Sequence, residues 1–430
     1  MKRKKKPAGV DASQWATVGV CLFLLGFAAP IPSQLPLIAL VGFALLATFF
    51  EAKPGRVGAP IPLMLAVAVF LVSTGLSLFF SVDRERSLEL SASWIPGVLL
   101  FVVISERLRS EANLRAVYAC LSFVALALSL ALLAGRWFYG PDAHSWLLEM
   151  GLPVLVVPND CHFLALLTPF SLILADRNPR SAVGACALVS IAATGLAIIA
   201  LGGRGAVLVW GACLVVTGVL LRPRLGLGLG ISALLIVGVG DAVLGFPLAS
   251  KFTQVVDSRV SLWMIAWEIF LDDPLLGQGP HTFRPLYFEY FNRIDFPDWV
   301  TFDPWGTAVP WAHNLYLEIL AERGIVGFLA FSGMTGIALL YAFRARLRGS
   351  DDVASLASGA IGGLAGLFVS GLFEASFLRV WTVVLLFCVL GVIGRLFALT
   401  PAVSEESGST GRAPPIGRKA KRSGRSGPAQ

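Results

Sequence analysis

The residue best suited to proton transfer is a histidine in the segment Pro310-Trp311-Ala312-His313-Asn314. An apolar run follows it and predicts a helix, so His313 lies just before a helix N-terminus. The positive end of a helix disfavours an imidazolium ion, so we expect a neutral ring that can accept a proton from a hydroxyl. Asn314 would orient a substrate hydroxyl or cap the helix. On this pattern alone, a histidine that merely caps the helix is an equally good interpretation.

Arginines form the second chemically notable group, because several fall on the predicted outer side of a membrane, where arginine is disfavoured. Arg204 stands in Gly202-Gly203-Arg204-Gly205, and Arg259 opens a predicted helix. The guanidinium group of arginine is planar and can donate two parallel hydrogen bonds to two phosphate oxygens. It also stays positively charged at any physiological pH. The diphosphate of a lipid-linked sugar would lie at this level. Taken one at a time, most of these arginines can be explained by a contact with a lipid headgroup or by an ion pair. Arg204 is the exception, because a tight turn between glycines gives it little freedom to swing out to solvent.

Four more polar residues are candidate supporting groups, namely Asn159, His162, Glu322 and Arg323. Asn159 and His162 lie at the outer end of a predicted span, where they would line a cavity or cap the helix. Glu322 would hold Arg323 or another arginine in place rather than react. We therefore expect these residues to assist the site rather than to carry the chemistry.

Metal, cofactor and nucleotide sites are not predicted. The sequence has no glycine-rich phosphate loop with lysine, no Asp-x-Asp pair and no His-Glu-x-x-His helix. Its six cysteines all lie in apolar runs, and no Cys-x-x-Cys pair occurs. We expect neither a metal nor a cofactor.

The composition indicates that these groups are positioned by helices in lipid. Hydrophobic residues make up 56% of the chain and charged residues 14%, against about 25% charged in soluble domains. The apolar runs are long and do not alternate with polar residues, so they predict helices rather than a β-barrel. The net charge of +7 sits in basic clusters at the two ends, which indicates contact with membrane lipids rather than nucleic acid.

We expect an all-α membrane protein of about twelve transmembrane helices. The predicted organisation is a basic cytoplasmic N-terminus (1–13), nine spans within 14–246, a large outer segment (247–324), three spans within 325–399 and a disordered basic tail (400–430). The predicted spans lie near 14–30, 34–50, 61–80, 93–105, 114–134, 156–175, 182–202, 205–221, 226–246, 325–343, 354–372 and 380–399. The fourth is short and Pro96 interrupts it. The first is retained rather than cleaved, because Pro30 follows the only small-residue site.

The charges agree with this organisation. With the N-terminus in the cytoplasm, every inner connection carries at least two cations, whereas the short outer connections carry fewer apart from Arg84 and Arg86. The outer segment 247–324 is rich in aromatic residues, which favour the membrane surface. Within it, Ser258 to Asp272 predicts an amphipathic helix lying on the membrane, with Asp257 or Ser258 as N-cap. A second helix is predicted to start near His313-Asn314 and to continue into the tenth span.

Three segments together resemble the superfamily of O-antigen ligases and O-antigen polymerases, which are bacterial membrane glycosyltransferases. The first is Gly203-Arg204-Gly205, similar to the Ser-Arg-Gly of the family, with glycine in place of serine. The second runs from Arg259 through Trp263 and Trp267 to Pro274-Leu275-Leu276-Gly277-Gln278-Gly279 and Phe283. The third, and the most specific, is His313-Asn314-Leu315-Tyr316-Leu317 with Glu322, Gly324, Ile325, Val326 and Gly327. The resemblance covers roughly residues 190–345.

The resemblance implies a GT-C-like fold in the bacterial inner membrane, with the active face extracytoplasmic. It implies metal-independent, inverting transfer of a glycan from undecaprenyl diphosphate in the biosynthesis of cell-surface polysaccharide, including lipopolysaccharide. Arg204 and Arg259 would bind the donor diphosphate, and His313 would take the proton of the acceptor hydroxyl. The acceptor would be lipid A core, a lipid-linked repeat unit or a protein hydroxyl.

Two other functions remain open at this level. A transporter fits twelve spans, but the sequence shows no internal repeat and no charges clustered in mid-span. A non-catalytic assembly subunit of the cell envelope would use the aromatic outer segment as an interface, but it would leave Arg204 and His313 without a role.

Overall fold

The computed structural model of the protein describes residues 12–29, 34–49, 58–140, 161–243, 248–300 and 307–401. The described residues up to Thr400 form one compact unit. Asn159, most of the basic N-terminus and nearly all of the predicted disordered tail lie outside the described residues, so the predictions for them stay predictions.

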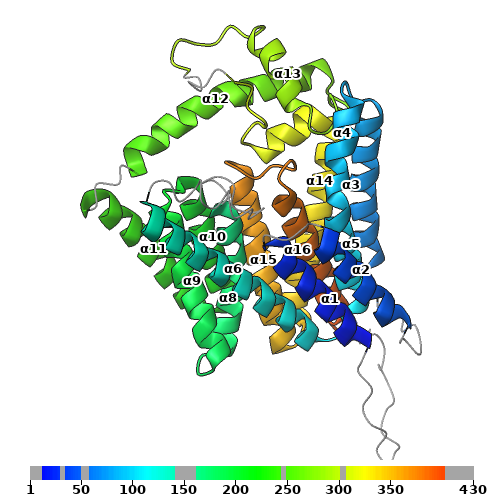
Figure 1. Ribbon diagram of the computed structural model, residues 1–430, viewed down its shortest axis with the longest axis vertical. Helices are drawn as coiled ribbons and strands as arrows, with labels where there is room; N and C mark the ends of the chain where they lie inside the picture. The colour runs from blue at the N-terminus through cyan, green and yellow to red at the C-terminus, as the bar shows by residue number, and fades with distance from the viewer. Residues whose placement is uncertain are drawn as a thin grey trace, which may run out of the picture. The chain divides into compact units, whose positions relative to one another are not determined.

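All regular structure in the described ranges is helical (Figure 1). The first half contains α1 (Ala12–Phe27), α2 (Gln34–Phe49), α3 (Ile61–Phe79), α4 (Arg84–Ser91), α5 (Ile95–Arg107), α6 (Glu111–Tyr139), α8 (Cys161–Arg177) and α9 (Ala182–Ala200). The second half contains α10 (Arg204–Leu221), α11 (Pro223–Val243), α12 (Leu248–Asp272), α13 (Phe283–Phe291), α14 (Leu315–Arg348), α15 (Asp351–Gly371) and α16 (Val380–Ala398).

Within the described residues, a helix occupies most of each of the twelve predicted spans. Among the described residues, eight helical segments are long and apolar enough to cross a membrane. The predicted fold class, an all-α membrane protein, is thereby confirmed. The predicted total of twelve spans stays a prediction.

The short fourth span is longer in the structure than the sequence suggests. Helix α4, a single 3-10 turn (Ala92–Trp94) and α5 follow one another without a gap, and together they make a 24-residue candidate span from Arg84 to Arg107. Pro96 lies in the first turn of α5. Its missing N–H costs nothing there, because the first amides of a helix have no intrahelical partner. Pro96 therefore starts α5 rather than interrupting it.

Helices α8, α15 and α16 are buried along almost their whole length. Helix α15 contacts α8, α10 and α14, and α16 contacts α5 (Figure 1). Glycines permit this approach: a Cβ atom at Gly362 would lie 1.9 Å from Thr217 Oγ1, and one at Gly366 would lie 2.3 Å from Cys213 Sγ.

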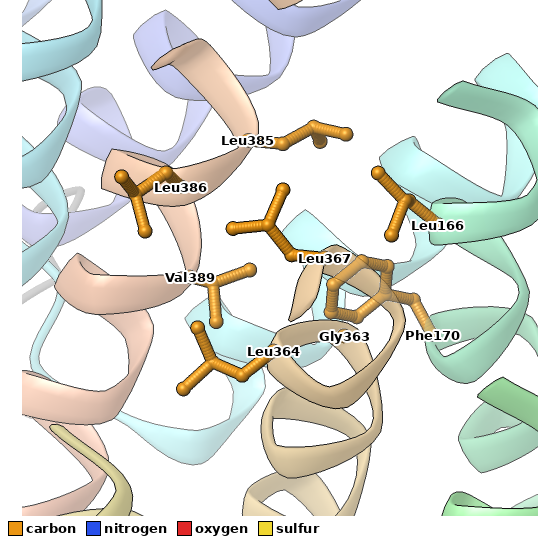
Figure 2. A pocket seen from close by; sticks show the side chains of 8 residues that line it. All are labelled: Leu166, Phe170, Gly363, Leu364, Leu367, Leu385, Leu386 and Val389. Carbon is orange, nitrogen blue, oxygen red and sulfur yellow. The ribbon is translucent and has the colours of Figure 1, made fainter. Parts of the chain in front are cut away.

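A small apolar gap lies where α8, α15 and α16 meet. Figure 2 shows its lining, which is Leu166, Phe170, Gly363, Leu364, Leu367, Leu385, Leu386 and Val389. Its volume of about 10 Å³ is no larger than the space of one water molecule. This gap in the core therefore has neither the room nor the polar groups for a substrate.

Helix α14 is broken at Gly324, which has φ +62° and ψ −169°. A break of this kind separates the amides of Ile325 and Val326 from the carbonyls of Ala321 and Glu322, their normal partners four residues earlier. Buried backbone groups left in this way need other partners. The second half of α14 then begins at Ile325, where the tenth span was predicted to start.

The loop that follows α12 supplies those partners. Pro274 O and Leu275 O accept from the amides of Ile325 and Val326 at 2.9 and 3.3 Å. The amides of Gln278 and Gly279 donate to Ala321 O and Glu322 O, both at 3.0 Å. The motif Pro274–Gly279 is thus a clamp that gives new partners to the two amides and the two carbonyls separated by the break, and it joins the long outer segment to a membrane helix.

Helix α12 corrects one prediction. It begins at Leu248, so Asp257 and Ser258 lie inside the helix and the predicted N-cap was wrong. An Asp or Ser caps a helix only where the chain before it turns, and no glycine or proline stands between Leu248 and Asp272 to end a helix. The predicted end at Asp272 is confirmed.

The apolar face of α12 packs on protein. Leu262, Ile265, Ala266 and Ile269 are buried in one cluster with Phe283, Tyr287 and Tyr290 of α13 and with Ala312 and Ala321. The amphipathic pattern of this helix therefore reflects contact with α13 and α14. Contact of its other side with a membrane surface stays a prediction.

Replacing Gly324 by alanine should destabilise the fold by about 2–6 kcal/mol. Alanine at φ +62° and ψ −169° would occupy a backbone region that essentially only glycine adopts, at a cost of about 1–3 kcal/mol, and overpacking adds about 1–3 kcal/mol, because the new Cβ would lie 2.2 Å from Leu275 O. Thermal unfolding of the detergent-solubilised protein measures the loss. Gly333→Ala in the same helix is the control, since a Cβ there meets nothing within 4 Å. Equal melting temperatures for the two variants would contradict the clamp.

Candidate active site

A buried carboxylate gathers the residues that the sequence singled out. Glu374 lies in the turn between α15 and α16 and is fully buried. Its Oε2 lies 2.9 Å from His313 Nδ1 and 3.7 Å from a terminal nitrogen of Arg259. Its Oε1 accepts from Arg379 at 2.7 Å. Two arginines and a histidine from separate parts of the chain therefore meet on one acid.

Different elements position these four groups. Arg259 stands on α12, His313 directly precedes the N-cap of α14, and Arg379 is the N-cap residue of α16. The turn that carries Glu374 is closed by its own backbone, since the amides of Glu374 and Ala375 both donate to Ser370 O, at 2.8 and 2.9 Å. The arrangement thus depends on how α12, α14 and the α15–α16 turn pack together.

The electrostatics of the cluster favour an ionised acid. Burial raises the pKa of Glu374, but its interactions with His313 and Arg379 more than offset this, so its pKa lies below the usual range. Burial also lowers the pKa of Arg259, which Glu374 partly restores, and a guanidinium stays charged nonetheless. One carboxylate thus faces two arginines and a histidine, which leaves a surplus of positive charge that can meet an anion.

His313 is held in one orientation. An ionised carboxylate only accepts hydrogen bonds, so Nδ1 of His313 donates to Glu374, and Nε2 of the neutral ring is left as an acceptor. The residue has φ +51°, an unfavourable conformation for a side chain larger than glycine. Strain of this kind persists where the surroundings impose it. Its side chain retains 17% exposure, so a substrate can reach it.

Asn314 caps the helix rather than pointing to a substrate. Its Oδ1 accepts from the amides of Tyr316 and Leu317 at 3.0 and 3.2 Å. Of the two roles open from the sequence, the structure shows the cap. Trp311, three residues earlier, packs on two of the three partners of Glu374: its ring lies 4.4 Å from the guanidinium of Arg379 and 5.1 Å from the ring of His313.

Arg204 begins α10 beside this cluster. Gly203 is the N-cap and Gly202 has φ +70°, as the tight glycine turn predicts. A Cβ atom at Gly205 would lie only 2.7 Å from His162 Nε2, so the first turn of α10 packs directly against His162.

His162 links this turn to the carboxylate. It is buried, its Nδ1 lies 2.9 Å from Ser370 Oγ, and it interacts electrostatically with Glu374 and Arg259. The structure therefore brings the start of α10, His162, Arg259 and His313 into one region.

Glu322 and Arg323 form a second buried cluster. Arg323 donates to Glu322 Oε2 at 3.0 Å, and its guanidinium lies 5.1 Å from the Trp94 ring and 5.2 Å from the Phe377 ring. Glu318 accepts from Ser376 Oγ and from the Phe377 amide, both at 2.9 Å. These contacts fix the stretch that follows Glu374, so the second cluster supports the first.

His281 is not part of the Glu374 cluster. It is buried between Arg86 and Arg323, and burial together with those two charges lowers its pKa to about 3. Arg86 donates to the backbone carbonyl of His281 at 3.1 Å. This contact gives a structural reason for Arg86, one of the two arginines, with Arg84, that lie in a short predicted outer connection.

Sequence reasoning missed Glu374 altogether. One signal was available, since Glu374 is the only acidic residue between Asp352 and Glu405. An acid isolated in so apolar a stretch needs a cationic partner. Within the described residues, no group of three or more His, Cys, Asp or Glu side chains is placed to hold a metal ion.

Comparison with known proteins identifies one domain. Residues 187–332 match a family model described as O-antigen ligase, and the matched segment contains Arg204, Arg259 and His313. No curated protein matches the chain. Residues 187–332 are therefore similar to the O-antigen ligase family, which confirms the predicted resemblance to the superfamily of O-antigen ligases and polymerases.

Proposed function

We propose that this protein is a glycosyltransferase that moves a glycan from undecaprenyl diphosphate to an acceptor hydroxyl at the extracytoplasmic face of the bacterial inner membrane. The similarity to the O-antigen ligase family supports the general class of the reaction. The observation that carries the finer proposal is the meeting of Arg259, His313 and Arg379 on the buried carboxylate of Glu374.

The arginines would act on the donor. When the bond between the sugar and the diphosphate breaks, negative charge grows on the leaving diphosphate. Arg259 and Arg204, with Arg379 nearby, would meet that charge with fixed donors, which stabilises the transition state more than the ground state. Their charge would serve in place of a metal ion.

His313 would act on the acceptor. Its Nε2 takes the hydroxyl proton while the acceptor oxygen bonds to the sugar carbon and the carrier diphosphate departs. A single displacement of this kind inverts the configuration at that carbon. Glu374 then faces the imidazolium that forms, so it both orients the ring and stabilises its charge, as an acid does in a hydrolytic triad.

The surrounding fold would be a GT-C-like bundle of twelve spans. The acceptor remains open among lipid A core, a lipid-linked repeat unit and a protein hydroxyl. The length profile of surface polysaccharide in a deletion strain separates the cases. A ladder that collapses to one repeat indicates a polymerase, whereas full chains left on the lipid carrier indicate a ligase.

His313→Ala should reduce product by about 10²–10⁴-fold, the usual contribution of a general base, while the protein inserts at the normal level. The product is measured as carrier-released glycan in cells lacking a second copy, and membrane level by immunoblot. Wild-type amounts of product from this variant would refute the role of His313 as the base.

The variants Arg204→Lys and Arg259→Lys should both lose glycan-transfer activity, because lysine keeps the positive charge but lacks the planar guanidinium that binds two phosphate oxygens at once. Arg293→Lys is the matched control, since Arg293 lies half-exposed and binds Asp272 and Glu289 away from the cluster. Turnover of a purified lipid-linked donor measures the effect. If lysine serves as well as arginine at 204 and 259, these residues are only charge anchors.

Glu374→Gln should lower kcat by roughly 10²-fold at an unchanged membrane level, because an amide neither fixes the His313 tautomer nor faces its charge. Glu374→Asp keeps the charge and should restore part of the rate. Equal loss in both variants would indicate a packing role for Glu374 and would remove it from the mechanism.

A further inference from the structure

Trp311 contacts the Glu374 cluster rather than an apolar core. Among the described residues, it belongs to neither of the two apolar clusters, and its ring contacts are with His313 and Arg379, at 5.1 and 4.4 Å. Ala312, between Trp311 and His313, is fully buried in the cluster formed with α12 and α13. The three side chains therefore alternate in direction, as they do in an extended chain, and Trp311 shares its side with the proposed base.

Four side chains close a circuit of contacts. Arg379 donates to Oε1 of Glu374 at 2.7 Å, and Oε2 of Glu374 lies 2.9 Å from His313 Nδ1. Trp311 contacts both of these partners of the acid. Each of the four groups thus touches two of the others, and Trp311 is the member that carries no titratable group.

The contact with Trp311 bears on how Arg379 can meet an anion. A guanidinium presents its donors in one plane, so its use to a diphosphate depends on how that plane is turned. The central carbon of the Arg379 guanidinium lies over the Trp311 ring, which restricts the plane to orientations that keep this contact. The ring also keeps water from one face of a side chain that is only 10% exposed, so the charge of Arg379 is screened less than in solvent.

The same ring also faces the charge that would form on His313. Aromatic rings attract cations within about 6 Å of the ring centroid, and the two ring centroids are 5.1 Å apart. When His313 takes the acceptor proton, its imidazolium becomes a second cation beside Trp311. This attraction is absent while the imidazole is neutral, so it favours the chemical step rather than the binding of substrate.

We propose that Trp311 is a positioning residue of the transfer reaction, which holds Arg379 and His313 at a fixed separation so that the leaving diphosphate and the acceptor hydroxyl are met together. This inference rests on the proposed glycosyltransferase function. Trp311 makes no bond to either substrate and acts through the arginine and the histidine.

Turnover of a purified lipid-linked donor by the full chain, with kcat and KM measured separately, tests this role. Trp311→Phe keeps an aromatic face and should retain kcat within about 3-fold. Trp311→Leu keeps an apolar side chain without a ring. It should lower kcat about 10-fold with KM little changed, the equivalent of a cation–π contact of about 1.4 kcal/mol. Trp299→Leu is the matched control and should leave kcat unchanged, because the Trp299 ring is 62% exposed in the segment after α13.

Two results would overturn the proposal. Equal kcat in the Phe and Leu variants would show that the aromatic face has no role, and a loss confined to KM would show that Trp311 binds substrate directly. If Trp311→Leu does not insert at the normal level, Trp311→Met takes its place, since methionine is apolar, flexible and without a ring. A wild-type protein that turns over no donor would refute the proposed function itself, so the two failures are distinguishable.

Discussion

The buried carboxylate of Glu374 is the interaction on which the candidate site depends. It holds His313, Arg259 and Arg379, which are up to 120 residues apart in the chain. Charges removed from water persist only when paired, and loss of one partner leaves the others uncompensated. The acid therefore keeps a histidine and two arginines together in a region where the two guanidinium groups would otherwise repel each other, and its single charge does not neutralise both of them.

The break at Gly324 gives this cluster its fixed geometry. Because the Pro274–Gly279 clamp completes the hydrogen bonds of the broken helix, the first half of α14 is anchored to the end of α12. His313 precedes that half-helix and Arg259 stands on α12. The same backbone clamp thus sets the separation between the proposed base and one of the proposed diphosphate ligands, and the glycines of the motif serve geometry rather than ligand binding.

Much of this was accessible from the sequence, because the informative signals were local. Apolar runs predicted the helices, and Arg259 and His313 stood out as charged or titratable residues beside helix ends. Glu374 was missed because its role arises from tertiary contacts that no spacing encodes. The start of α12 was misplaced because Asp257 and Ser258 are good caps only where the chain turns. The role of Asn314 became clear only once its Oδ1 was seen to meet two amides.

The backbone adds to the positive character that the side chains give the site. Helices α10, α14 and α16 begin at Arg204, Leu315 and Val380, each next to a residue of the cluster or of its immediate surroundings. Helix N-termini carry partial positive charge and free amides. Asn314 caps α14, but no side chain caps α10 or α16. An anionic leaving group would therefore meet helix dipoles as well as guanidinium groups. Glu374 offsets part of this positive charge in the resting site. The remaining positive charge would be compensated only when negative charge develops on the donor during the proposed reaction.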